Sequence, residues 1–258
     1  MTKFLISLLL AIGCLVNGAV LAKETGSEWL LKQSTLDLGT LNVFICDDAV
    51  KVECPRQGYC VLSKAPDWQV YYYRPLEKTM WVTTLDLFNG LLLTNPFGVP
   101  KYGNGSANKV GVIKYAGVNC VQFRPPIAQS WIAYASDEIS TNPKVCEFLN
   151  RYYYFYNSGR VPVYKKIESS GNKRKLGGGW LSTDMSGDLR NQPRVSLETV
   201  SAKRIAYRSA DFDVPQNFQR VHNVNDISLS KVHKQQINDL VDSLGFTTEL
   251  GETQKPKH

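Results

Sequence analysis

The sequence is poor in the residues from which most catalytic and metal sites are built. It has three histidines, and none of His222, His233 and His258 lies at metal-ligand spacing from a cysteine. No Gly-x-Ser-x-Gly nucleophile motif is present. The glycines at 177–179 are not followed by the Lys-Ser/Thr of a phosphate-binding loop. We therefore expect no metal, no other cofactor and no enzymatic activity.

Acidic pairs, which would serve a glycosidase, are also few. The closest are Asp47-Asp48 and Asp137-Glu138, and each lies at a turn signal, where acidic residues bond the local backbone. A glycosidase needs two carboxylates that face each other across a cleft. Nothing in the sequence indicates that arrangement, so an enzyme ranks third among the hypotheses below.

Long apolar runs are absent after the first 22 residues. Lys3 precedes an apolar run at 4–16, which is too short to span a bilayer and is typical of a secretory signal peptide cut after Ala22. We expect a periplasmic or secreted protein that is not transmembrane. The alternative is a lipoprotein anchored through Cys14, because 11–14 loosely resembles a bacterial lipobox.

The rest of the chain has the length of one domain. We expect a mainly β domain at 23–246 that ends in an amphipathic helix at 231–244, and a polar tail at 247–258. The formal net charge is +7. Because the basic residues are spread out and no nucleic-acid motif accompanies them, we expect no nucleic-acid partner.

Five cysteines follow the predicted signal peptide, and an exported chain usually oxidises its thiols. Cys54 and Cys60 are placed to staple the two sides of a hairpin. Cys120 with Cys146 is the next simplest pair. Cys46 is then left over, either as a free thiol or paired with another chain.

The centre of the chain predicts a β-hairpin. Its arms, 68–74 and 79–85, are rich in aromatic and β-branched residues, and Pro75 opens a turn between them. Alternate residues of a strand share a face. One face therefore carries Trp68, Val70 and Tyr72 on the first arm, and Met80 and Val82 share a face on the second. Both faces are apolar, so one packs on a core and the other needs a cover.

Short hairpin-connected strands dominate the remainder, which indicates an α+β, mainly antiparallel fold. The pattern predicts further strands at 36–46, 49–53, 59–63, 109–115, 118–123, 127–135, 161–167, 180–183, 194–207 and 212–221. It predicts helices at 85–93, 142–154 and 231–244, and a helical start at 27–34. Pro143 suits the first turn of the second of these helices.

Aromatic residues are the most prominent functional signal. They gather in the central hairpin and in a row of five at 152–156. One interpretation is core plus exposed tyrosines. The functional interpretation is a concave apolar surface with polar tips, which suits an acyl chain or a peptide.

The order of these elements resembles the LolA-like fold of periplasmic lipoprotein carriers and their lipid-binding relatives. The resemblance rests on the hairpin at 68–78, the strand at 161–166 and the Phe-x-Val-Pro-x-x-Phe segment at 212–218. It implies a curved half-barrel sheet, covered by short helices, around an apolar cavity. The chain departs from lipoprotein carriers in its longer C-terminus and its five cysteines.

Two function hypotheses follow. The first is an exported, non-enzymatic carrier or binder of a lipid or of a lipoprotein acyl chain, with lids at 85–93 and 143–156. Its candidate lining residues are Trp68, Val70, Tyr72, Met80, Val82, Leu87, Phe88, Phe148 and Tyr152. The alternative is an exported module that binds a protein or glycan through exposed aromatics. Burial of 152–156 against the sheet favours the first, and a flat exposed row favours the second.

Overall fold

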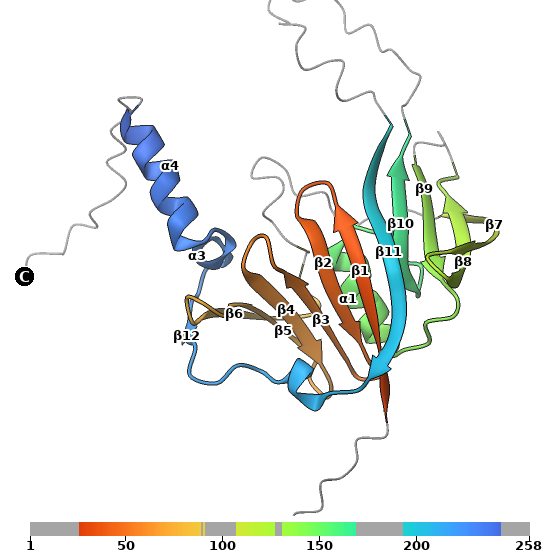
Figure 1. The fold of residues 1–258 in the computed structure, drawn as a ribbon, viewed down its shortest axis with the longest axis horizontal. Coiled ribbons are helices and arrows are strands. Elements are labelled where there is room, and N and C mark those ends of the chain that lie inside the picture. Colours follow the sequence, from red (N-terminus) through yellow and green to blue (C-terminus); the bar gives the residue numbers. More distant parts are fainter. Residues whose placement is uncertain (1–25, 89, 91–106, 127–130, 169–192, 244–258) are drawn as a thin grey trace, which may run out of the picture.

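The computed structural model describes residues 26–88, 90, 107–126, 131–168 and 193–243 (Figure 1). The predicted signal peptide, Cys14, the strand expected at 180–183 and the polar tail lie outside these residues.

Twelve strands form one open, curved sheet, in the order β12-β6-β5-β4-β3-β2-β1-β11-β10-β9-β8-β7 (Figure 1). All neighbours pair antiparallel except β12 and β6, which are parallel. The strands are β1 (Ser27–Thr35), β2 (Gly39–Ile45), β3 (Ala49–Cys54), β4 (Tyr59–Lys64), β5 (Gln69–Arg74), β6 (Thr79–Thr84), β7 (Asn108–Tyr115), β8 (Val118–Arg124), β9 (Trp131–Ser136), β10 (Val161–Ile167), β11 (Arg194–Ala206) and β12 (Gln219–Arg220).

Strand β1 corrects the helical start expected at 27–34. It lies between β2 and β11 near the middle of the sheet and is covered on both faces. Trp29 and Leu31 are buried on one face and Glu28 on the other. A strand buried on both sides carries apolar residues without strict alternation, so periodicity alone does not separate it from a helix.

The central hairpin is confirmed as β5 and β6. Tyr72 lies opposite Trp81, and Tyr73 lies opposite Met80. Directly opposed residues point to the same face of an antiparallel pair. Trp81 therefore shares the face of Tyr72, and Met80 shares the other face with Tyr73.

Helix α1 (Pro143–Tyr152) confirms the helix expected from the Asn-Pro start. The Asn142 side chain accepts a hydrogen bond from the Lys144 backbone at 2.9 Å, and Pro143 occupies the first turn. The helix packs against β3, β4 and β10. Five strand spacings of about 4.8 Å separate β4 from β10 along the sheet, whereas a helix is about 10 Å wide. The sheet therefore curls around α1, and we call this concave side the α1 face.

The C-terminal part first crosses the outer face of the sheet. A 3-10 helix, η2 (Ser209–Phe212), and a loop stand where a strand was expected at 212–221. Phe212 is buried there, and the Phe218 ring lies 6.0 Å from the Tyr73 ring. These aromatics cover the outer face without joining the sheet, and only β12 pairs with it.

The chain then returns to the α1 face through α3 (Val224–Ser228). Arg74, which is buried, donates hydrogen bonds to the carbonyls of Ile227 at 2.7 Å, Ser228 at 2.8 Å and Gln57 at 2.6 Å. A cation at the carbonyl end of a helix is favourable. Arg74 therefore anchors α3 to the sheet.

Helix α4 (Lys231–Ser243) confirms the described part of the helix expected at 231–244 and projects away from the sheet (Figure 1). No helix in the described part of the chain is long and apolar enough to cross a membrane.

Candidate functional site

The sheet carries a separate apolar cluster on each face. The cluster on the α1 face joins residues of β1–β5 to α1 and to Ile227 of α3. The outer cluster contains Phe44, Leu62, Tyr73, Met80 and Phe212. A ligand under the predicted lids would therefore contact the cluster on the α1 face and not the outer cluster.

Six of the nine predicted lining residues come together on the α1 face. They are Trp68, Val70, Tyr72, Phe88, Phe148 and Tyr152. Met80 and Val82 instead belong to the outer cluster, because the register of the hairpin places Trp81, not Met80, opposite Tyr72. Leu87 is 71% exposed and packs in neither cluster.

The gathered residues form a chain of aromatic contacts from the expected lids to the sheet. The Phe88 ring stacks on Phe148, with centroids 5.3 Å apart and planes at 6°. The ring centroids of Phe148 and Tyr152 are 6.1 Å apart. The Tyr152 hydroxyl oxygen lies 3.0 Å from that of Tyr59, within hydrogen-bond distance. Tyr59 meets Tyr72 edge to face at 4.9 Å. The site is therefore a continuous aromatic surface that α1 and the sheet share.

Polar contacts fix the end of α1 to three strands. The Tyr153 hydroxyl donates to Gln33 Oε1 on β1. Gln33 Nε2 donates to the Pro162 carbonyl at 3.0 Å and to Thr199 Oγ1 at 2.9 Å. Burial raises the pKa of Tyr153 well above its ordinary value, so this hydroxyl stays protonated and keeps its hydrogen bond at physiological pH.

Residues 85–88 and Gly90 close the other side of the site. Residues 85–87 form a turn and Phe88 is irregular, so the described residues do not begin the helix expected at 85–93. Arg151 Nη1 donates to the carbonyls of Asp86 at 3.0 Å and Phe88 at 3.3 Å. Gly90 has φ of +71°, and a Cβ there would lie 2.6 Å from the Arg151 carbonyl oxygen. The segment thus packs closely on the end of α1.

The aromatic row at 152–156 is not a flat exposed surface. Tyr152, Phe155 and Tyr156 are buried, and Tyr153 and Tyr154 are half-buried. Phe155 and Tyr156 pack on β8 and β9 in a third apolar cluster. These aromatic residues therefore pack as part of the core and do not form the exposed row that the interaction-module alternative needs.

The cysteines differ from the expected staples, because all five are free thiols in the described part of the chain. Cys54 lies on the α1 face and Cys60 on the outer face, so the sheet separates the two sulfurs. Burial raises the pKa of Cys60, Cys120 and Cys146 to about 11. These thiols are protonated at neutral pH and are poor nucleophiles.

The side chains that meet on the α1 face are mostly aromatic and aliphatic. Within the described ranges, no three His, Cys, Asp or Glu side chains gather closely enough to hold a metal ion. The α1 face offers aromatic rings and a few hydroxyls. The Tyr72 hydroxyl is buried with no hydrogen-bond partner among the described residues, which leaves it available to a ligand.

Several residues that shape the site were not predicted. Gln33, Tyr59 and Arg151 act through partners 120, 93 and 65 positions away in sequence. A local pattern holds no signal for such contacts. Only the positive φ needed at Gly90 has a local correlate, namely the Asn-Gly pair in which it stands.

Comparisons with known proteins give no family. No family pattern matches the sequence, and no curated protein is similar to it. Solved structures with weak similarity include an uncharacterised conserved protein from Thermus thermophilus, with 11% identity, a TM-score of 0.40, and coverage of 78% of this chain and 93% of that one. A putative outer membrane lipoprotein-sorting protein domain from Vibrio parahaemolyticus has 11% identity, a TM-score of 0.25, and coverage of 80% and 94%. The MucA/MucB complex of Pseudomonas aeruginosa has 10% identity, a TM-score of 0.29, and coverage of 78% and 59%.

Proposed function

We propose that this protein binds the acyl chain of a lipid or acylated protein on its α1 face, as an exported, non-enzymatic carrier. One observation carries the proposal. Phe88 enters the apolar cluster from an irregular turn, is 1% exposed, and stacks flat on Phe148 of α1. A ring inserted from a loop in this way fills a slot that an apolar ligand takes when the loop withdraws.

Withdrawal of residues 85–88 breaks hydrogen bonds to the end of α1. Arg151 donates to the carbonyls of Asp86 and Phe88, and each such bond contributes about 1 kcal/mol net. An acyl chain that buries about ten methylene groups gains about 8 kcal/mol. Withdrawal of Phe88 gives up the burial of its own side chain, about 3 kcal/mol, and an aromatic stack of about 1 kcal/mol, and the gain from the acyl chain exceeds these losses.

A photoactivatable fatty acid tests the location of the site. The chain carries a diazirine near its end, and cross-linked peptides are mapped by mass spectrometry. We expect labels on Trp68, Val70, Tyr72, Phe148 and Tyr152. Labels confined to Met80, Val82 and Tyr73 would place the ligand on the outer face and contradict the proposal.

A pair of matched variants tests the role of Phe88. Phe88 and Phe212 are both almost fully buried, at 1% and 2% exposure, but on opposite faces. Both substitutions to Ala open a cavity and destabilise the fold by a similar amount, about 3–5 kcal/mol. We expect only Phe88→Ala to raise the affinity for a fluorescent fatty acid. Equal affinity in the two variants would mean that Phe88 does not occupy the ligand site.

A second candidate function rests on three tyrosines of β7, β9 and β10, at the other end of the sheet from the central hairpin. Tyr115, Tyr134 and Tyr164 are half-buried, and their ring centroids lie 4.9–5.5 Å apart. Tyr164 pairs with Glu198 on the side of β11 opposite the buried Thr199. Stacked tyrosines with exposed edges suit a protein or glycan partner. Loss of that partner, but not of acyl binding, in a Tyr164→Ala variant would separate the two functions.

A further inference from the structure

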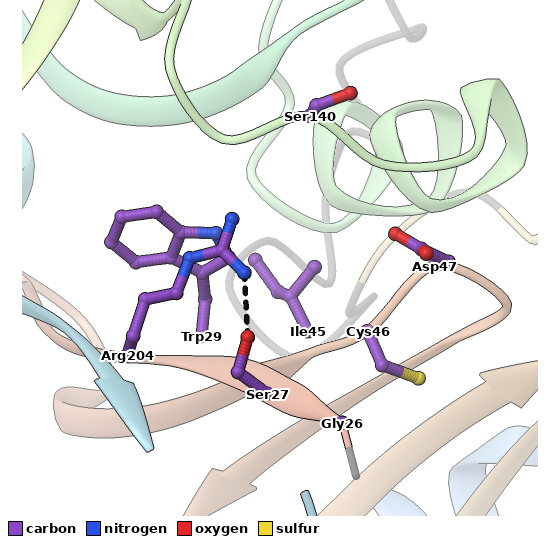
Figure 2. A pocket seen from close by; sticks show the side chains of 8 residues that line it. All are labelled: Gly26, Ser27, Trp29, Ile45, Cys46, Asp47, Ser140 and Arg204. Atoms are coloured by element: carbon purple, nitrogen blue, oxygen red, sulfur yellow. Dashed lines mark hydrogen bonds between the residues drawn. The ribbon is translucent and has the colours of Figure 1, made fainter. Parts of the chain in front are cut away.

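A small polar pocket lies at the end of the α1 face, beside the start of α1. It has a volume of about 230 Å³ and is lined by Gly26, Ser27, Trp29, Ile45, Cys46, Asp47, Ser140 and Arg204 (Figure 2). Trp29 is the cross-strand neighbour of both Ile45 and Arg204, so three adjacent strands form its floor.

The floor presents two kinds of hydrogen-bond donor, a guanidinium with one acceptor and an indole N–H with none among the described residues. The Arg204 guanidinium lies 4.9 Å from the centre of the Trp29 ring, and its Nη1 donates to Ser27 Oγ at 2.6 Å (Figure 2). The Trp29 side chain is 8% exposed, and its indole N–H has no hydrogen-bond partner among the described residues. A buried, unpaired N–H is costly. An oxyanion that bridges the guanidinium and the indole N–H would satisfy both.

The opposite wall carries an acceptor. The exposed residues Asp47 and Ser140 line this side of the cavity, and the Asp47 carboxylate is its acceptor (Figure 2). Thr141 Oγ1 donates to the Cys46 carbonyl at 2.8 Å, and the Asn142 N–H donates to the Asp47 carbonyl at 3.3 Å. These bonds hold the wall in place against the β2–β3 turn. The pocket therefore offers a cation and an anion to one small ligand.

We infer that this pocket binds a phosphodiester that carries a primary ammonium group, with the phosphate at Arg204 and Trp29 and the ammonium at Asp47. Trp29 and Ile45 belong to the same apolar cluster as Phe88 and Phe148. The pocket lies beside the start of α1, since Ser140 precedes Pro143 by three residues. Phe88 stacks on Phe148, five residues or about 8 Å further along the helix. If the proposed acyl-binding function holds, on which this step rests, the ligand is a phospholipid with a phosphoethanolamine-type headgroup, and not a lipoprotein anchor.

Three ligands test the assignment by displacement of a fluorescent fatty acid from the full-length protein. They are dioleoyl phosphatidylethanolamine, dioleoylglycerol with the same chains but no phosphate, and glycerophosphoethanolamine with the headgroup but no chains. We expect the phospholipid to bind at least about tenfold more tightly than dioleoylglycerol, because a charge-assisted hydrogen bond contributes that much discrimination.

The decisive variant is Arg204→Gln, with Arg208→Gln as its control. Arg208 is an equally exposed arginine of the neighbouring segment, paired with Asp211 at 2.8 Å. We expect Arg204→Gln to reduce the affinity for the phospholipid about tenfold and to leave that for dioleoylglycerol within twofold, while Arg208→Gln changes neither.

The outcomes separate the two claims. Equal affinity of the wild-type protein for the phospholipid and dioleoylglycerol overturns the headgroup site and leaves acyl binding standing. Binding of neither lipid overturns the acyl-binding function itself. Binding of glycerophosphoethanolamine as tightly as the phospholipid, lost in Arg204→Gln, supports the phosphate site but assigns it to a free headgroup and not to a lipid.

Discussion

A buried carboxylate on the outer face makes the stability of the fold depend on pH. Glu28 has no exposed surface, and its carboxyl group lies beside the Arg208 backbone and the Asp211 side chain. Burial, reinforced by the negative charge of Asp211, raises the pKa of Glu28 from 4.5 to about 7, although the nearby Arg208 opposes the rise. The substitution Glu28→Gln removes this titration while keeping the shape of the side chain.

The sign follows from which state holds the proton. Between pH 4.5 and about pH 7 the folded chain keeps the Glu28 proton and the unfolded chain has lost it, so stability falls as the pH rises through this window. A rise in pKa of this size corresponds to about 3 kcal/mol. In Glu28→Gln the side chain never ionises, and this contribution to the pH dependence disappears.

Urea unfolding at intervals from pH 4.5 to 8 measures the effect. We expect the stability of Glu28→Gln relative to the wild type to increase by about 3 kcal/mol across this range. Glu198→Gln makes the same chemical change at an exposed position of β11, and we expect a nearly constant difference for that variant. A constant difference for Glu28→Gln as well would show that Glu28 titrates normally and would refute the reasoning.

Three further predictions concern the closure of the site and the thiols. Gly90→Ala forces a Cβ against the Arg151 carbonyl. Gly117 has a similar φ of +87°, but a Cβ there would meet nothing within 4 Å. We expect Gly90→Ala to lower the free energy of unfolding by about 1–3 kcal/mol more than Gly117→Ala does, measured by thermal unfolding, and to take up a fluorescent fatty acid faster. Tyr59→Phe leaves the Tyr152 hydroxyl buried without its partner and lowers the free energy of unfolding by about 1–3 kcal/mol. The double variant Tyr59→Phe/Tyr152→Phe should lose less stability than the sum of the two single variants. Additive losses would show that the hydrogen bond contributes nothing. The five described cysteines are free. When residues 23–258 are unfolded in the absence of reductant, iodoacetamide should therefore add five alkyl groups. The addition of only one would indicate the two disulfides expected from the sequence.

Local patterns predicted most of the strands, helix α1 and which residues of one strand share a face, but not strand β1, the turn at 85–87 or the loop after η2. The hairpin of β5 and β6 and the start of α1 followed from alternation, turn residues and the Asn-Pro cap. The relation between the two arms did not follow, because a shift of one residue in register reverses every side chain. This is why Met80 and Val82 were expected on the wrong side of the sheet.

Long-range pairing accounts for the other differences. Cys54 and Cys60 appeared suited to a staple because they are close in sequence, but the odd–even position of each in its strand puts them on opposite faces. Trp29 and Arg204 are cross-strand neighbours although 175 positions separate them. No local signal marks that contact, and so the pocket they form was not expected.

The central claim is that an acyl chain occupies the α1 face, and the most direct test is native mass spectrometry of the protein purified from the cells that produce it. Organic extraction of the same sample then identifies any bound molecule. We predict an adduct that is released as an acylated compound and is displaced by an added fatty acid. A protein of the bare chain mass that also fails to take up added fatty acids or phospholipids would contradict the account.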